Sequence, residues 1–208
     1  MTIPKYKKCK SIDLKEGVKM SLVPNFEMGL WNAWIFMLYH QLLCIVLLGS
    51  KGLLIKSSAA TPHKKTKRKI VTFLGLIYYL ALIYSIFLPF KLGTTWFYIG
   101  LPIALSGLIM YTIVMVNFAT TPLNEPVTKG LYHYSRNPQY LTEFLVFIGV
   151  SIASASWIFL LFSIVYEVSL LSFASSEEHF CLEKYGDAYR EYMNRTPRYI
   201  GIPKSKEK

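Results

Sequence analysis

The chain is organised around blocks of apolar residues that are about as long as a lipid bilayer is thick. Five such blocks occupy roughly residues 29–49, 70–90, 97–118, 138–155 and 157–174. A helix needs about 20 predominantly apolar residues to cross the ~30 Å hydrocarbon core. Because lipid cannot satisfy backbone polar groups, such segments cross a membrane as helices. The sequence therefore predicts an all-α integral membrane protein with about five transmembrane helices.

The composition supports a membrane protein over a nucleic-acid-binding one. Of 208 residues, 53% are hydrophobic and 17% are charged, and the net charge is +11. The basic residues lie beside the apolar blocks, where they would face anionic lipid headgroups. No aromatic and basic platform for a single strand is visible. We expect membrane lipids as partners and no nucleic acid.

The distribution of Lys and Arg predicts the orientation. With the amino terminus outside, the polar segments after the first, third and fifth blocks face the cytoplasm. This arrangement places sixteen basic residues inside and seven outside, as the positive-inside rule favours. It leaves the lysine-rich lead, residues 1–28, outside and the basic loop, residues 50–69, inside. An alternative is that the first block, which contains Asn32, His40 and Gln41, only enters the interface.

The last two blocks predict a helical hairpin. One helix from Tyr140 to Ala174 would be about 50 Å long, longer than the hydrocarbon core is thick. A break is available in the run of small residues from Gly149 to Trp157, which would also let two helices approach closely. The hairpin returns the chain to the face it left, so the segments before and after it should lie near each other.

The polar tail after residue 174 predicts two short cytoplasmic helices. The first runs from Ser176 to Tyr185, and the second follows Gly186 and ends at Asn194. Ser175 and Glu178 fit a capping box at the start of the first helix. That pairing would leave Glu177 free to bind a cation such as an α-ammonium.

The hairpin opens with Arg136-Asn137-Pro138, a good helix start because Asn caps and Pro suits the first turn. The same helix N-terminus could instead bind an anionic group. Two acids lie within the apolar blocks, Glu143 and Glu167, and ionisable residues there are functional candidates. We take Arg136 and Glu143 as candidate catalytic residues, although Glu143 could simply lie near the headgroups.

Several chemistries lack their motifs. The four histidines show no H-x-x-x-H or H-E-x-x-H spacing, and the three cysteines are scattered, so no metal site is predicted. No G-x-G-x-x-G, P-loop or G-x-S-x-G run occurs, so no Rossmann nucleotide site or hydrolase elbow is expected. The tyrosines around the hairpin start could anchor the interface or line a pocket for a flat base.

The residues around the hairpin resemble a known family. Gly130-Leu-Tyr132, Arg136-Asn137-Pro138-x-Tyr140, the apolar hairpin, Glu177-Glu178 and Tyr185-Gly-Asp-x-Tyr-x-x-Tyr192 follow one another as in the isoprenylcysteine carboxyl methyltransferases. That family is related to the membrane phospholipid methyltransferases. The resemblance covers about residues 120–200 and implies an S-adenosylmethionine-dependent methyltransferase with a cytoplasmic active site.

Carried over by position, the resemblance implies a set of cofactor-binding residues. These are Asn124, Glu125, Pro126, Val127, Gly130, Tyr132, Asn137, Pro138, Gln139, Tyr140, Glu177 and Glu178. It also divides the chain into residues 1–118, with three membrane segments, and a methyltransferase region, residues 119–208, within one structural domain.

Two departures from the family pattern bear on the substrate. The family usually has His at the position of Asn137, although Asn can also donate and accept hydrogen bonds. An arginine that orients the substrate carboxylate in the carboxyl methyltransferases corresponds here to Phe173. We therefore expect a lipid-soluble or small hydrophobic acceptor in place of a prenylcysteine carboxylate.

Two alternative interpretations remain at this stage. An NADPH-dependent membrane reductase of the sterol or steroid type has a similar tyrosine-rich hairpin, and the Asn-Pro-x-Tyr-x-x-Glu run ending at Glu143 resembles steroid reductases. A non-enzymatic membrane scaffold would explain the apolar blocks but not the polar clusters at both ends of the hairpin.

Overall fold

The computed structural model describes residues 27–48 and 65–203, and the regular secondary structure of these residues is helical. Six α-helices and one short 3-10 helix follow in the order α1 (Trp34–Leu48), α3 (Lys65–Ile86), α4 (Thr95–Thr120), η1 (Gly130–His133), α5 (Pro138–Ala153), α6 (Trp157–Tyr185) and α7 (Asp187–Arg195). Within the described residues, the extended pairing is limited to one isolated bridge between Asn32 and Pro89. The predicted all-α class is confirmed. The predicted lysine-rich lead and most of the basic loop lie outside the described residues.

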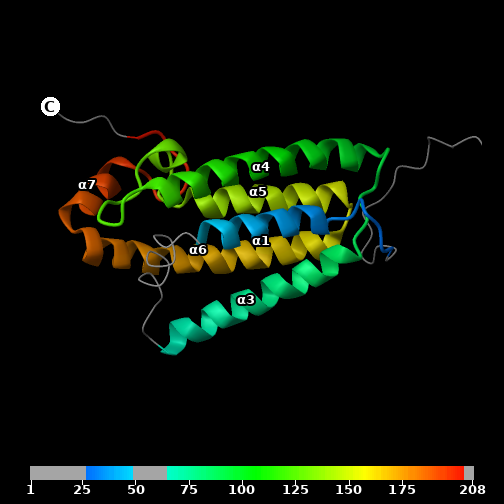
Figure 1. Cartoon of the computed structure of the whole chain (residues 1–208), viewed down its shortest axis with the longest axis horizontal. Helices are drawn as coiled ribbons and strands as arrows, with labels where there is room; N and C mark the ends of the chain where they lie inside the picture. The colour runs from blue at the N-terminus through cyan, green and yellow to red at the C-terminus, as the bar shows by residue number, and fades with distance from the viewer. Residues whose placement is uncertain (1–26, 49–64, 204–208) are drawn as a thin grey trace, which may run out of the picture.

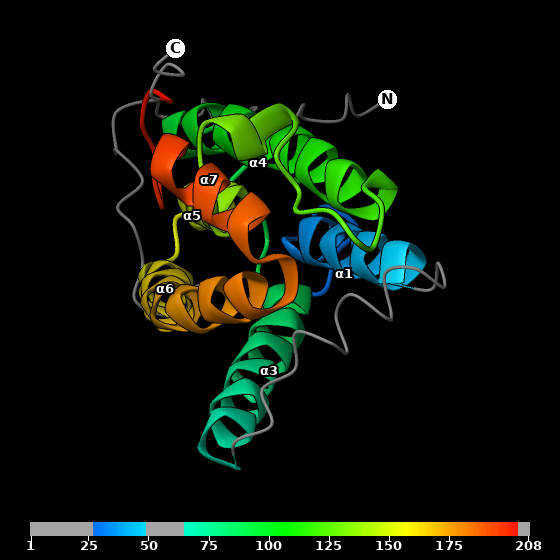
Figure 2. The same cartoon turned by 90° about the vertical axis from the view of Figure 1, so that its left-hand side faces the viewer.

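Helices α1, α4, α5 and α6 run side by side along the long axis, and α3 diverges from them toward its own start (Figures 1 and 2). One end of the bundle carries η1, α7 and the ends of α4 and α6 (Figure 1). The opposite end carries the turn between α3 and α4 and the turn of the α5–α6 hairpin. The segments before and after the hairpin thus lie at the same end, as predicted.

Two helices, α4 and α6, are long and apolar enough to cross a membrane. Helices α1 and α5 and the apolar part of α3 (Thr72–Ile86) are shorter. The outer faces of the bundle carry large apolar side chains with high exposure, among them Val46, Ile109 and Leu161 at 69%, 62% and 64%. Soluble proteins rarely expose apolar surface on this scale, whereas lipid favours it. The five-span count remains a prediction.

The closest helix contact lies between α4 and α5, because small residues let their backbones touch. A Cβ added at Gly149 would lie 2.2 Å from the Ala104 backbone N, and one at Gly100 would lie 2.2 Å from the Ala153 backbone N. A Cβ added at Gly107 would lie 2.7 Å from the Val146 backbone N. The small residues of the hairpin therefore serve the packing of α5 on α4. The sequence predicted that the small residues after Gly149 would let two helices approach closely, and the structure shows that the two helices are α4 and α5.

The hairpin break lies where the sequence predicted it. α5 ends at Ala153, Ala155 takes a positive φ of 49°, and Ser156 caps α6 by accepting a hydrogen bond from the Phe159 backbone N–H at 3.2 Å. The Lys91 backbone N–H donates to the Ala153 carbonyl at 3.0 Å, which joins this turn to the turn before α4.

The predicted separate helix from Ser176 is wrong, because α6 continues without a break from Trp157 to Tyr185. The sequence after residue 174 contains no Gly or Pro until Gly186, so nothing stops the helix at the end of its apolar part. The capping box of Ser175 with Glu178 is wrong for the same reason: a helix interior has no free amides to cap. The predicted stop at Gly186 is confirmed, with a φ of 56°.

We expect Gly149→Val to destabilise the protein strongly, because the new side chain would overlap the α4 backbone. Overpacking of this kind typically costs about 1–3 kcal/mol or more. Gly75→Val is the matched control, since nothing lies within 4 Å of a Cβ at Gly75 on α3. Thermal unfolding of both variants in one detergent checks this. Equal unfolding temperatures for the two would contradict the α4–α5 contact.

Candidate functional site

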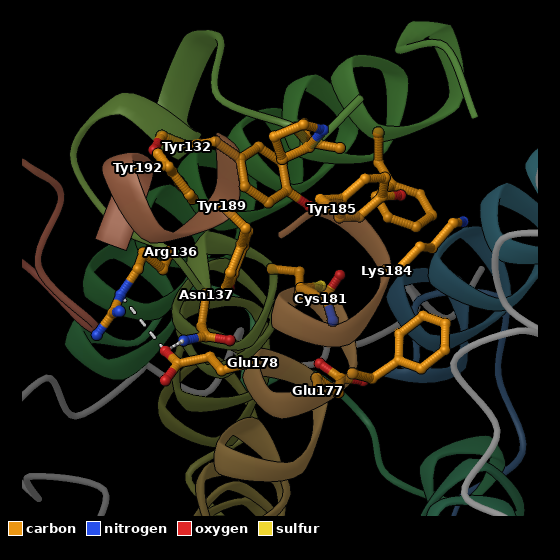
Figure 3. Close-up of a pocket in the computed structure, with 15 residues that line it drawn as sticks. Tyr132, Arg136, Asn137, Glu177, Glu178, Cys181, Lys184, Tyr185, Tyr189 and Tyr192 are labelled. Atoms are coloured by element: carbon orange, nitrogen blue, oxygen red, sulfur yellow. Dashed lines mark hydrogen bonds and ion pairs between the residues drawn. The ribbon is translucent and has the colours of Figure 1, made fainter. Parts of the chain in front are cut away.

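A pocket lies at the end of the bundle where α5 begins and α6 ends (Figure 3). Its walls come from the end of α4, the segment before η1, η1 itself, the start of α5, the end of α6, and α7. Six of the fifteen lining residues are aromatic, and two carry carboxylates. The lining residues are Phe118, Pro126, Val127, Tyr132, Arg136, Asn137, Gln139, Glu177, Glu178, Phe180, Cys181, Lys184, Tyr185, Tyr189 and Tyr192.

Of the two carboxylates, Glu178 makes more hydrogen bonds and ion pairs. Its side chain is 4% exposed, and Arg198 donates to it from Nε at 3.1 and 3.2 Å and from Nη2 at 2.5 Å. Arg136 Nε lies 3.4 Å from Oε1, an electrostatic contact without hydrogen-bond geometry (Figure 3). These hydrogen bonds to Glu178 raise the pKa of Arg198 above its usual value. Glu178 therefore holds two arginines and has little capacity left for a ligand.

Glu177 is placed differently. Its Oε2 accepts a hydrogen bond from the Tyr140 hydroxyl at 2.6 Å, and the side chain lines the pocket. Figure 3 shows the two glutamates diverging, with Glu178 toward Arg136 and Glu177 toward the opposite wall. Among the described residues, Glu177 has no cationic partner within ion-pair distance. Of the two acids, Glu177 is therefore the one that is open to a cationic ligand.

Asn137 precedes the first residue of α5, as predicted, and Pro138 occupies the first helical turn. However, the Asn137 side chain does not cap the helix. Its Nδ2 donates to Glu178 Oε1 at 3.3 Å and to the Arg198 carbonyl at 3.1 Å. The predicted side-chain cap is therefore wrong, because the amide ties the tail to the helix start instead.

The C-terminal tail and α7 are tied to the η1 region by hydrogen bonds. The Tyr192 hydroxyl donates to the Tyr132 carbonyl at 2.6 Å, and the Arg136 backbone N–H donates to the Pro197 carbonyl at 3.0 Å. Burial raises the pKa of Tyr132, Tyr189 and Tyr192, so their hydroxyls remain protonated. These tyrosines present aromatic surfaces and hydrogen-bond donors, and no negative charge.

The structure brings most of the predicted cofactor residues to this pocket. Those on its surface are Pro126, Val127, Tyr132, Asn137, Gln139, Glu177 and Glu178, together with the catalytic candidate Arg136. Pro138 and Tyr140 are buried behind the wall. Asn124 and Glu125 are exposed outside it. The other catalytic candidate, Glu143, lies deeper in the bundle against His40.

Gly130 does not line the pocket. A glycine is needed at this position because of the backbone conformation. It takes a φ of 63°, and an added Cβ would lie 2.1 Å from Asn117 Nδ2. A side chain at Gly130 would therefore be strained and would also strike α4. The residue positions η1 and Tyr132 without needing to touch a ligand.

Sequence reasoning missed much of the aromatic wall as a binding surface. Phe118, Phe180, Cys181, Lys184 and Tyr185 all line the pocket. Four of these five follow Glu177 on α6 at offsets of three, four, seven and eight, the spacing of one helix face. The predicted helix from Ser176 to Tyr185 already contained this spacing, but the sequence did not show that this helix face lines a pocket. Phe118 had no signal, since it is the end of an apolar block.

Comparison with known families identifies the region that holds this pocket. Residues 88–188 match the model of the phospholipid methyltransferases. These residues form a domain of the phospholipid methyltransferase family. The predicted family resemblance is thereby confirmed, and the match extends it back through α4. A search of the curated proteins finds no match.

Membership of this family implies a methyltransferase at a membrane. It agrees with the apolar outer faces of α4 and α6, which lie within or overlap the matched region. Glu177, Asn137 and Tyr132 also lie within it.

We expect Glu178→Gln to destabilise the fold, because it leaves Arg136 and Arg198 without their common anion. Arg198 is 40% exposed, so we expect a loss of about 2 kcal/mol, less than for a fully buried pair. Chemical denaturation measures this. Glu177→Gln is the matched control and should unfold close to the unsubstituted protein. The opposite order of stabilities would contradict the assignment of Glu178 as the structural acid.

Proposed function

We propose that the protein is an S-adenosylmethionine-dependent methyltransferase that acts on a lipid-soluble or small hydrophobic acceptor at the membrane interface. The observation that carries the proposal is the Glu177 carboxylate, which lines a pocket rich in aromatic side chains and has no cationic partner among the described residues. The cofactor supplies an activated methyl group on a sulfonium. The chain's own residues must bind it, align it and exclude water.

The residues of the pocket suit the two ends of this cofactor. Glu177 Oε2 is held by Tyr140, which orients the carboxylate and leaves Oε1 for an α-ammonium. Tyr132, Tyr185 and Tyr189 line the pocket with ring surfaces that suit a purine base. Aromatic faces also attract a cationic sulfonium. The donor set and the aromatic lining therefore fit the proposed cofactor.

Glu178 contributes by position. Through Arg198 and Asn137 it fixes the tail against the start of α5, so that α7 covers the pocket. Tyr192 adds a second tie from α7 to Tyr132. A covered pocket excludes water from the reacting methyl group, which is the main requirement of a displacement that needs little acid–base chemistry.

We place this pocket at the cytoplasmic end of the bundle. The segments after α4 and α6, which the positive-inside rule assigns to the cytoplasm, lie at the pocket end (Figure 1). The methyl acceptor would then reach the pocket from the surrounding lipid.

An NADPH-dependent reductase is less well supported. Arginine is the side chain best suited to bidentate phosphate binding, but Arg136 and Arg198 both face Glu178, which leaves Lys184 as the basic residue of the described pocket lining that could bind a phosphate. Arg190 and Arg195 pair with acids on α7 itself. A scaffold would not need an uncompensated carboxylate in a pocket, because such a group is costly without a ligand.

The test is calorimetry of the detergent-purified protein with S-adenosylhomocysteine and with NADPH. We expect the first to bind and the second not to bind. Glu177→Gln should weaken S-adenosylhomocysteine binding about 10–100-fold, because a charge-assisted hydrogen bond contributes roughly 1.5–3 kcal/mol.

Glu183→Gln is the matched control, since Glu183 is exposed on the same helix and lies outside the pocket. It should bind S-adenosylhomocysteine as the unsubstituted protein does. Tight NADPH binding without a response to S-adenosylhomocysteine would reverse the ranking of the two enzymes.

A further inference from the structure

A second cavity lies inside the bundle, away from the pocket at its end. Its volume is about 290 Å³, and all five of the long helices contribute to its wall. The polar groups that matter are His40 on α1, Tyr78 on α3, Tyr111 on α4, Glu143 on α5 and Tyr166 on α6. A polar cavity at this depth in an apolar bundle is costly unless it has a use.

The centre of the cavity is a buried pair of ionisable groups. His40 Nε2 lies 3.2 Å from Glu143 Oε1, but the geometry is not that of a hydrogen bond. The other ring nitrogen, Nδ1, is hydrogen-bonded with the Tyr78 hydroxyl at 2.9 Å. His40 is 5% exposed and Glu143 is 7% exposed. The carboxylate of Glu143 is thus only partly compensated.

Glu167 adds a second buried acid beside this cavity. It follows the lining residue Tyr166 on α6 and is 4% exposed. Neither of its carboxylate oxygens has a hydrogen-bond partner among the described residues. It is also close enough to Glu143 for the two carboxyls to repel each other. Glu167 does not itself line the cavity, so Glu143 is the one carboxylate among the described lining residues.

The Glu143 carboxylate, with no lysine or arginine among the described lining residues, defines the ligand that fits. A head group that donates hydrogen bonds, such as an amine or a hydroxyl, would satisfy the open oxygens. The rings of Tyr78, Tyr111 and Tyr166 would also favour a cation over an anion. A phosphate or carboxylate would meet the acids without any lysine or arginine among the described lining residues.

The cavity opens between α1 and α3, where Gly75 and the half-exposed Tyr79 lie on its rim. Helix α3 diverges from the bundle on this side (Figure 2). None of the residues that the structure describes comes within 4 Å of a Cβ at Gly75. The opening therefore faces the surroundings of the bundle, which are lipid if the helices lie in a membrane.

The cavity also lies directly beneath the cofactor pocket. Gln139 lines the pocket at the end of the bundle, and Glu143 lines the cavity. The two residues are one turn apart on the same face of α5. One turn corresponds to a separation of about 5–6 Å along the helix. A molecule whose head group rests at Glu143 would lie next to the end pocket.

We propose that this cavity binds the head group of a lipid-soluble molecule that donates hydrogen bonds and carries no anionic group. The molecule enters between α1 and α3, and His40 and Glu143 receive its head group. The inference rests on the proposed function in taking this molecule as the methyl acceptor. The binding itself does not depend on the methyl donor.

The test uses the full chain in neutral detergent and tritiated hexadecylamine as the probe. We expect saturable binding of the probe, and unlabelled hexadecylamine and hexadecanol should displace it. Hexadecyl phosphate and palmitate should compete at least about tenfold more weakly, which corresponds to the loss of one hydrogen bond or more. Glu143→Gln should weaken hexadecylamine binding about tenfold or more, because it removes the charge but keeps the shape. Equal competition by all four compounds would overturn the proposal.

A second pair of variants tests the entrance without touching the acids. Gly75→Phe should narrow the opening and weaken binding of hexadecylamine, whereas Leu76→Phe should not. Leu76 is exposed on the same helix and does not line the cavity. Binding that is unchanged in both Gly75→Phe and Glu143→Gln would overturn the proposal.

S-adenosylhomocysteine binding, measured on the same samples, separates the two proposals. Glu143→Gln and Gly75→Phe should retain it, and Glu177→Gln should lose it while retaining hexadecylamine binding. If the protein binds hexadecylamine but not S-adenosylhomocysteine, the proposed methyltransferase function is refuted and the proposed ligand site in the cavity stands. A protein that binds S-adenosylhomocysteine with no saturable hexadecylamine site would refute the cavity alone.

Discussion

The pocket depends on one buried carboxylate. Glu178 accepts hydrogen bonds from Arg198, which belongs to the C-terminal tail, and from Asn137, which precedes α5. A buried charge is stable only when it is paired and hydrogen-bonded. Satisfying Glu178 therefore requires the tail to return to the start of the hairpin. That return places α7 and its tyrosines over the pocket. It also leaves Glu177, one residue earlier, to face the pocket.

This arrangement relies on a rigid support, which the contact of α4 with α5 provides. Glycine and alanine at facing positions allow the two backbones to meet, so α5 is fixed against α4 over most of its length. In lipid, where apolar side chains gain little from leaving their solvent, close packing of small residues is the main source of helix association. The position of Asn137 and Tyr140 at the end of α5 follows from that packing.

Two polar sites then share one helix. α5 carries Tyr140, which holds Glu177 in the end pocket, and Glu143, which meets His40 one turn deeper. The upper site is aromatic and contains an acid suited to a cation in water-accessible surroundings. The site at Glu143 is lined by all five long helices, opens toward their surroundings and contains an acid that is only partly compensated. Such an arrangement would let a polar cofactor and a hydrophobic acceptor meet from opposite directions.

The amino-acid sequence alone predicted most of the helices and two of the breaks between them. Apolar length gave the helices, Gly186 and the run after Gly149 gave the breaks, and the motif order gave the family. It could not show that α6 continues through Glu177, because a polar continuation of a helix resembles a new helix with its own cap. Only the tertiary structure decided which glutamate is neutralised. That choice depends on Arg198, twenty residues along the chain, and sequence spacing does not encode which charges meet once the tail has folded back.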